Sequence, residues 1–513
     1  MKYPLGIQTF AKLREDDYVY VDKTTLIYEL ITTGSTYFFS RPRRFGKSLL
    51  VSTLESLFRG ERDLFKGLAI ADTDYDFAEY PIVLFEFTNV VTEQAADVKR
   101  YIINTTNMIA EQYSIELTFD SFEERVSELI RKLYNKTGKP VVLLVDEYDK
   151  PILDSLFQKH SKEVRKVLAG FYAVIKQADK FLKFVFITGV SKFAKISVFS
   201  GMNSLTDISM NLRYATICGV TEQELSNQFN DPICQLAAME QLERQQLMEK
   251  LKHWYNGYYF HQDALGVYNP YSLLSLFYTQ EFDNYWFNTA TPTFLLDLLQ
   301  NRQYSLKDLT KLEVVKKAFN ACEPENMDVQ SIFLQTGYLT IKEYNAPLYK
   351  LDFPNYEVKM SFYDSVATRY SKLSDGQGLS FSVKLIQYLQ AQAFEDFFET
   401  LSVFFANIPN NITLDNEKYY QSLLFAIFKL IGLSVDVEVN TNLGRIDCVV
   451  KTDDMICIME FKLNGTKEDA MQQIIDRKYA EKYQQDGKEL VLIGVEFDKD
   501  ERNIGGFLVG DIG

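Results

Sequence analysis

The segment Gly46-Lys47-Ser48 combines three residue types that together can hold a nucleotide phosphate. It follows an apolar run, Thr36–Ser40, that predicts a buried strand, and it opens an apolar stretch, Ser48–Phe58, that predicts a helix. Backbone amides at a helix start point at anions, and a lysine at this position reaches the outer phosphates. The hydroxyl of Ser48 can bind Mg²⁺. The segment therefore predicts a phosphate-binding loop.

The residues before Gly46 complicate this prediction. The general pattern has a glycine five residues before Gly46, where this chain has Arg41. Without that glycine, Gly-Lys-Ser also occurs as a plain helix start. Arg43 and Arg44 could pair with phosphate oxygens or could be solvated loop charges. We count both of them, together with Phe45, among the candidate nucleotide-binding residues.

Two carboxylates, Asp146 and Glu147, directly follow a second apolar run, Val141–Val145. In phosphate-loop ATPases such a pair holds Mg²⁺ and polarises the attacking water, so we assign the first role to Asp146 and the second to Glu147. The alternative is a buried strand that ends in an acidic turn. The order and separation of the two segments favour nucleotide binding. A further predicted strand, Phe184–Thr188, precedes Ser191, whose hydroxyl could lie near the outer phosphate or could belong to a turn.

A second pair of carboxylates lies near the C-terminus. Two apolar runs flank a polar turn at Asp453 and Asp454, which predicts a β-hairpin with Asp447 directly across from Glu460. Strand alternation places Lys462 on the same face as Glu460. Opposed carboxylates repel, and bound Mg²⁺ or Mn²⁺ would offset the repulsion and activate water against a phosphodiester, with Lys462 orienting the nucleophile. The alternative is an exposed hairpin with a Glu/Lys face.

Two neighbouring segments could add to this site. Glu417 begins a predicted helix and could supply a further metal-binding carboxylate, or it could be an ordinary first-turn carboxylate favoured by the helix dipole. Gln472 and Gln473 lie on a later amphipathic helix, and one of them could contact the site. The alternative for that helix is a solvated face, which is the interpretation that we favour.

The composition excludes several classes of protein. The 513 residues are 46% hydrophobic, which is typical of a globular chain. The net charge of −15 means that any contact with DNA or RNA must come from a local basic surface or through a divalent metal. Three histidines and five cysteines, none in a CxxC pair, argue against a Ser-His-Asp triad, a zinc ribbon or a disulfide framework. No apolar run reaches the roughly 18 residues of a membrane helix, so we expect a soluble cytoplasmic protein without membrane contact.

The pattern of elements predicts three domains. Residues 1–215 alternate apolar strands with amphipathic helices, which is typical of a parallel α/β sheet. Residues 216–375 are predicted to form a mostly helical lid or middle region. A polar stretch at 372–378 is the best linker candidate, and residues 376–513 are long enough for a further compact α/β domain.

The motifs taken together resemble the bacterial AAA-ATPase-like family that carries a C-terminal PD-(D/E)XK nuclease superfamily domain. The resemblance rests on Arg41–Ser48 (RPRRFGKS), Val21–Thr24 (VDKT), Asp146–Pro151 (DEYDKP), Gly201–Asp207 (GMNSLTD), Trp254–Tyr258 (WYNGY), Tyr268–Pro270 (YNP) and Gln335–Leu339 (QTGYL). It covers nearly the whole chain. It implies a P-loop NTPase domain over 1–215, a restriction-endonuclease-like α/β domain over 376–513, and the cofactors ATP and Mg²⁺, with Mn²⁺ as an alternative at the second site.

Two functional hypotheses follow. The first is an enzyme, an ATP-regulated, metal-dependent nuclease (a hydrolase) in which ATP at Lys47 and Ser48 gates the site at Asp447, Glu460 and Lys462. The second is a nucleotide-gated binding switch, whose nuclease-like domain docks a partner or nucleic acid without cleaving it. Neither the choice between DNA and RNA nor the oligomeric state follows from the sequence, although many P-loop ATPases work as rings or dimers.

Overall fold

The computed structural model describes residues 1–156, 158–192, 204–286, 312–319, 328–371, 377–406, 434–440, 445–452, 454–462, 465–498 and 503–511, together with a few isolated positions between them. The chain divides into two compact units. An N-terminal unit comprises Met1–Ala290 and Lys311–Val358, and a C-terminal unit comprises Thr291–Thr310 and Lys359–Gly513. The boundaries of the three predicted domains remain a prediction.

The N-terminal unit is built on a parallel five-stranded sheet in the order β2-β3-β4-β1-β5. Its strands are β1 (Thr36–Ser40), β2 (Ile82–Glu86), β3 (Val141–Asp146), β4 (Leu182–Gly189) and β5 (Thr206–Asp207). Every residue of β1 and of β3 is buried, as expected for central strands that are covered on both faces. The predicted strands and the predicted parallel sheet are confirmed.

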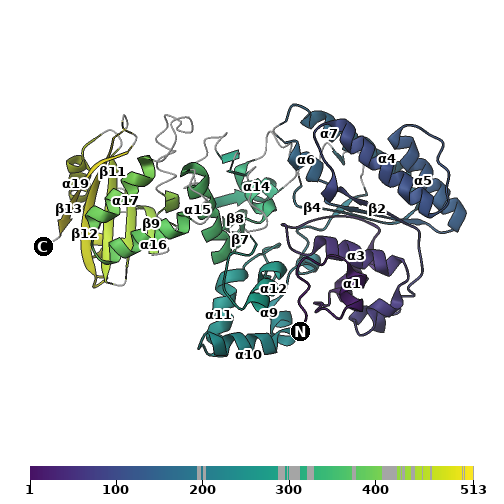
Figure 1. Ribbon diagram of the computed structural model, residues 1–513, viewed down its shortest axis with the longest axis horizontal. Helices are drawn as coiled ribbons and strands as arrows, with labels where there is room; N and C mark the ends of the chain where they lie inside the picture. The colour runs from purple at the N-terminus through teal and green to yellow at the C-terminus, as the bar shows by residue number, and fades with distance from the viewer. Residues whose placement is uncertain are drawn as a thin grey trace. The chain divides into compact units, whose positions relative to one another are not determined.

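Helices cover both faces of this sheet. Figure 1 shows α4, α5 and α7 on one face and α1 and α3 on the other. The helices of this part are α1 (Phe10–Glu15), α2 (Thr24–Thr33), α3 (Lys47–Phe58), α4 (Ala95–Gln112), α5 (Phe122–Thr137), α6 (Lys150–Asp154) and α7 (Ser161–Gln177). The carboxyl ends of parallel strands meet at one edge, which is where open α/β sheets bind their ligands.

The rest of the N-terminal unit is mostly helical. Its helices are α9 (Glu222–Gln228), α10 (Asn230–Met239), α11 (Arg244–Tyr255), α12 (Pro270–Thr279) and α14 (Val329–Thr336), and α15 (Tyr356–Ser371) begins here. Helices α9 to α12 share one apolar core, against which Tyr3, Val19 and Val21 of the N-terminal segment pack. The helical prediction missed a small antiparallel sheet of β6 (Leu312–Val315), β7 (Thr340–Asn345) and β8 (Leu348–Asp352).

The C-terminal unit contains a second five-stranded sheet, in the order β13-β12-β11-β10-β9. Its elements are α16 (Gln377–Gln390), α17 (Phe394–Ala406), β9 (Ser434–Asn440), β10 (Arg445–Lys451), β11 (Met455–Lys462), α19 (Lys467–Asp476), β12 (Glu489–Asp498) and β13 (Asn503–Asp511). Strands β11 and β12 are parallel, and the other pairs are antiparallel. Helix α19 packs on β11 and β12, and α17 packs on β13 (Figure 1). This is the predicted compact α/β fold.

Candidate functional sites

The predicted phosphate loop lies between β1 and α3, at the carboxyl edge of the parallel sheet. Gly46 precedes the helix with a φ of +86°, and no atom lies within 4 Å of the place where a Cβ would stand. The loop therefore uses the left-handed backbone that glycine adopts without strain, and it leaves open space in front of α3. Lys47 is the first residue of α3, and its Nζ donates a hydrogen bond of 3.1 Å to the carbonyl of Pro42.

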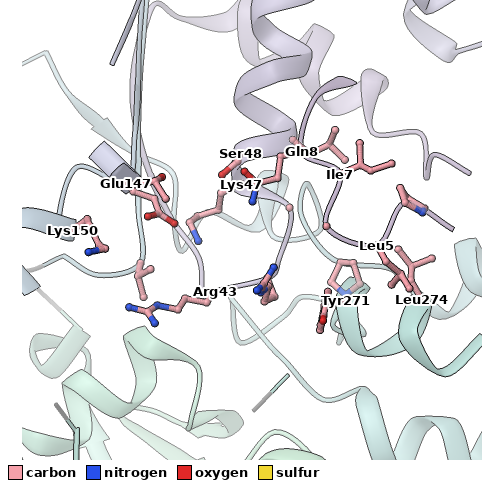
Figure 2. A pocket seen from close by; sticks show the side chains of 18 of the residues that line it. Leu5, Ile7, Gln8, Arg43, Lys47, Ser48, Glu147, Lys150, Tyr271 and Leu274 are labelled. Carbon is pink, nitrogen blue, oxygen red and sulfur yellow. The ribbon is translucent and has the colours of Figure 1, made fainter. Parts of the chain in front are cut away.

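A cavity of about 370 Å³ opens beside this loop. Its size falls within the range of small-molecule sites in proteins. Figure 2 shows Lys47, Ser48 and Glu147 gathered at one end, and Leu5, Tyr271 and Leu274 at the other. Arg43, Arg44 and Lys150 add positive charge to the lining. One polar end with several cations and one largely apolar end suit a ligand with phosphates and a flat ring system.

The two carboxylates after β3 differ in their surroundings. Asp146 is 2% exposed and accepts hydrogen bonds from the hydroxyl of Thr188 and from the amide of Glu147, the latter at 3.1 Å. Glu147 lines the cavity, and its φ of +53° is a left-handed conformation that costs a non-glycine residue energy. The strand end therefore holds Asp146 inside the fold and turns Glu147 toward the cavity.

Ser191 does not reach the cavity lining. Its hydroxyl donates to Oδ2 of Asp149 at 2.6 Å, and its amide donates to the same oxygen at 2.7 Å. Burial raises the pKa of Asp149. Asp149 also lines the cavity, so this carboxyl joins the turn after β4 to the turn after β3. The turn interpretation of Ser191 describes its observed contacts.

Arg41 is a buried residue beneath the loop. Its guanidinium donates to the carbonyls of Ser40 at 2.9 Å, Ser209 at 2.6 Å and Tyr214 at 3.1 Å. It also lies over the ring of Phe260, with 3.8 Å from Cζ to the ring centre. Burial lowers the pKa of Arg41 to about 10. The residue that replaces the pattern's glycine therefore braces the loop from inside the protein.

The other loop residues divide between core and cavity. The Phe45 side chain is 1% exposed and packs edge-on against Tyr258, with 4.7 Å between ring centres, so only its backbone can face a ligand. Arg43 and Arg44 are exposed and line the cavity. The Arg44 guanidinium lies over the ring of Tyr271 at 4.8 Å. Of the lining residues, Lys150 and Tyr271 were not among the candidate nucleotide-binding residues, since neither falls within the phosphate-loop pattern.

The hairpin that carries the second carboxylate pair has the predicted register. Strands β10 and β11 pair from Cys448 with Met459 to Lys451 with Ile456, which puts Asp447 opposite Glu460. The Phe461 amide donates to Oδ2 of Asp447 at 3.0 Å. Nζ of Lys462 lies 3.8 Å from Oε1 of Glu460. Asp447, Glu460 and Lys462 therefore meet on one face of the sheet.

Helix α19 covers this face and supplies a further residue. Gln473 donates from Nε2 to Glu460 and accepts at Oε1 from Nζ of Lys462. It stands between the buried positions Ala470 and Ile474 at helical spacing, which is the signal that could have distinguished it from the exposed Gln472. The helix can approach closely because residue 494 on β12 is glycine, where a Cβ would lie 2.4 Å from the carbonyl of Lys467.

Glu460 is a buried carboxylate that lies beside a second carboxylate, Asp447. It is 2% exposed, and burial together with the charge of Asp447 raises its pKa to about 7. Two adjoining carboxylates, one of them buried, are the donor set that a divalent cation stabilises, so the residues present fit such an ion. No cluster of three or more His, Cys, Asp or Glu side chains suited to a metal occurs among the described residues, and Glu417 lies outside them.

Within the part of the chain that the structure describes, each helix is too short or too polar to cross a lipid bilayer.

Two protein families match the chain, each over one part. The family described as "Predicted AAA-ATPase" matches residues 4–199, and the PD-(D/E)XK nuclease superfamily matches residues 415–507. The first match contains the phosphate loop with Asp146 and Glu147, and the second contains Asp447, Glu460 and Lys462.

A relative matches along the full length. A protein of Azotobacter chroococcum mcd 1, described as "Uncharacterized protein in vnfD 5'region", is 39% identical over 526 residues. The matched region covers 100% of this chain and 99% of that protein. The two parts of the chain therefore occur in the same order in a second protein of similar length.

Proposed function

The chain belongs to the family of predicted AAA-ATPases that carry a C-terminal PD-(D/E)XK nuclease superfamily domain, and from this membership we propose that it is an ATP-regulated, metal-dependent nuclease. ATP and a divalent cation are its proposed cofactors, and DNA or RNA is its proposed substrate. The observation that carries the proposal is the cluster of Asp447, Glu460 and Lys462 on one hairpin face, in a chain that also has a cavity at a phosphate loop.

The cavity beside α3 supports the nucleotide part of the proposal. Lys47 and the amides at the start of α3 would bind the outer phosphates, and Arg43 and Arg44 would neutralise further phosphate charge. Glu147 would accept the proton of the attacking water, and the buried Asp146 would orient the ligands of Mg²⁺ together with Ser48. When bound, Mg²⁺ supplies positive charge against the developing charge on the phosphates.

The hairpin face supports the nuclease part. Asp447 and Glu460 would hold a divalent cation, which supplies an activated water and charge stabilisation when bound. Lys462 stands beside Glu460 and would stabilise negative charge on the scissile phosphate. Gln473 fixes both side chains, since it bonds to Glu460 and to Lys462 at once. The acidic chain would meet nucleic acid through a local surface, which its net charge of −15 requires.

The test is a cleavage assay on the purified full chain. Single- and double-stranded DNA and RNA are incubated with Mg²⁺ or Mn²⁺, with and without ATP. Asp447→Ala is the inactive variant, and Glu468→Gln, an exposed carboxylate of the same unit, is its matched control. We expect cleavage by the wild type and by Glu468→Gln, and none by Asp447→Ala. Cleavage that persists in Asp447→Ala would refute the proposed nuclease site.

Nucleotide binding is tested separately by titration calorimetry. Lys47→Ala should abolish ATP binding, and Lys99→Ala, which removes an exposed lysine of α4, should not change it. Equal ATP affinity in Lys47→Ala and the wild type would contradict the proposed placement of the phosphates. ATP dependence of cleavage in the first assay would then establish whether the two sites are coupled.

One observation favours a second candidate function, a nucleotide-gated binding switch. Without a cation, Glu460 and Lys462 already have a shared partner in Gln473, so hydrogen bonds alone hold the two side chains in place. A domain that only docks a partner needs these hydrogen bonds but no bound metal. The two candidates differ in metal binding, because a docking domain would give no Mn²⁺ heat signal that depends on Asp447.

A further inference from the structure

The phosphate loop is held by an indole from a distant part of the chain. Trp286 is 1% exposed, and its Nε1 donates a hydrogen bond of 3.0 Å to the backbone carbonyl of Arg43. Its ring also packs against Tyr338, with 5.0 Å between centres. Because the peptide bond between Arg43 and Arg44 is planar, fixing this carbonyl also fixes the direction of the Arg44 amide. Trp286 therefore orients a peptide of the loop that lines the nucleotide cavity.

Trp286 is in turn held by a buried carboxyl group. Oε1 of Glu357 accepts a hydrogen bond of 2.7 Å from the Trp286 amide, and the Ser272 hydroxyl lies 2.9 Å from both carboxyl oxygens. Glu357 is 0% exposed. Removing it would leave the Trp286 amide without this partner in the protein interior, which is costly. A continuous chain of hydrogen bonds thus runs from Arg43 through Trp286 to Glu357.

Two members of this chain of bonds, Trp286 and Glu357, stand close to the positions where the polypeptide passes from one unit to the other. Trp286 precedes Ala290, after which the chain enters the C-terminal unit, and Glu357 precedes Val358, after which it does so again. Glu357 is also the second residue of α15, whose residues from Lys359 onward belong to the C-terminal unit. The same hydrogen-bonded residues therefore touch the loop and the start of a helix that continues beyond the N-terminal unit.

We propose that Trp286 and Glu357 are positioning residues that link the nucleotide state of the phosphate loop to helix α15. Nucleotide that reorients the peptide of Arg43 changes the hydrogen bond to Trp286, and Glu357 carries the change to α15. We call this path from Arg43 through Trp286 and Glu357 to α15 the relay. It deepens the proposed function and rests on it, because it supplies a path by which ATP would regulate the C-terminal unit.

Hydrogen exchange on the full chain tests the relay. The backbone amides of α15 from Lys359 to Ser371 are followed with and without saturating ATP and Mg²⁺. We expect ATP to slow their exchange severalfold in the wild type. Trp286→Phe keeps most of the ring and removes the indole N–H, so it should abolish the ATP effect on α15 while its ATP affinity falls by about fivefold. Tyr172→Phe, a buried ring whose hydroxyl finds no hydrogen-bond partner among the described residues, is the matched control.

Glu357 provides a second, independent pair of variants. Glu357→Gln keeps an acceptor for the Trp286 amide and should retain the ATP effect on α15. Glu357→Ala removes that acceptor and should lose the effect. If Trp286 and Glu357 were purely structural, their replacement would lower stability. The effect of ATP on α15 exchange would then not depend on whether the hydrogen bond between them is kept. This pair tests the relay even where Trp286→Phe does not fold.

The outcomes separate the relay from the function on which it rests. ATP binding by calorimetry without any change in α15 exchange would overturn the relay and leave the nucleotide site standing. Unchanged protection of α15 in Trp286→Phe at saturating ATP, or in Glu357→Ala, would overturn it as well. Absence of ATP binding in the wild type would refute the nucleotide function itself, and the relay with it.

Discussion

The backbone amide of Asp447 lies 3.4 Å from Oε2 of Glu460, across two paired strands of the C-terminal sheet. Glu460 is almost fully buried, and Asp447 adds a like charge beside it. The fold therefore maintains a pair of carboxylates that repel each other when both are ionised. Such an arrangement lowers stability unless a cation or a proton offsets it.

Glu460→Gln should stabilise the metal-free protein and remove its response to Mn²⁺. The amide cannot ionise, so the C-terminal unit should gain about 1 kcal/mol in free energy of unfolding. In the wild type, Mn²⁺ at a hundred times its Kd should add about 2.7 kcal/mol, which Glu460→Gln should lose. Scanning calorimetry with and without Mn²⁺ measures both effects. If Mn²⁺ stabilised Glu460→Gln as much as the wild type, the metal site would be contradicted. The control variant Glu468→Gln should be stabilised by Mn²⁺ as the wild type is.

Replacement by methionine should affect stability at one arginine of the loop, Arg41, and ATP affinity at another, Arg43. Arg41→Met leaves buried carbonyls without donors, so it should lower the free energy of unfolding by at least about 2 kcal/mol. Arg43→Met removes an exposed side chain, so stability should stay within about 0.5 kcal/mol while ATP affinity falls roughly tenfold. Thermal unfolding and calorimetric ATP titration of both variants separate the two roles. A stable Arg41→Met protein with weakened ATP binding alone would show that Arg41 acts on the ligand.

Glu147→Gln should separate ATP binding from ATP turnover. The carboxylate lines the cavity from a left-handed backbone position, a strained conformation of the kind that occurs at functional sites. The amide keeps the shape and cannot accept that proton, so turnover should fall by at least about a hundredfold with ATP affinity changed only a few fold. Phosphate release and calorimetry measure the two quantities, with Glu163→Gln on α7 as the control. Turnover that survives in Glu147→Gln would assign the base to another residue.

The local sequence pattern was sufficient to predict the strands that carry the candidate site residues. Completely buried runs such as Val141–Val145 predict central parallel strands, because a strand covered on both faces needs apolar side chains throughout. The hairpin register also followed from the sequence. A polar turn predicted at Asp453 and Asp454 sets the pairing of the two apolar runs, and Asp447 opposite Glu460 is its consequence.

The residues that sequence missed act through contacts between distant segments. Arg41 is recognisable as a brace only once Ser209 and Tyr214 are brought beneath the loop, more than 160 positions later in the chain. Trp286 likewise gains its role from packing that no local period encodes. The small sheet of β6, β7 and β8 was missed because its short strands lie among longer helical segments. Phe45 shows the reverse case, since its loop position suggests ligand contact whereas its side chain belongs to the core.

Glu357 should make the stability of the protein fall as the pH rises toward 8. Burial raises the pKa of this carboxyl from 4.5 to about 8, so between these values the folded chain holds a proton that the unfolded chain has released. Unfolding then releases a proton, and stability decreases by up to about 1.4 kcal/mol per pH unit within the window and levels off above it. Glu357→Gln removes this proton exchange and should flatten the decrease. Melting temperatures of the N-terminal unit across the window test the prediction, and an equal slope in both proteins would show that Glu357 is ionised in the folded state.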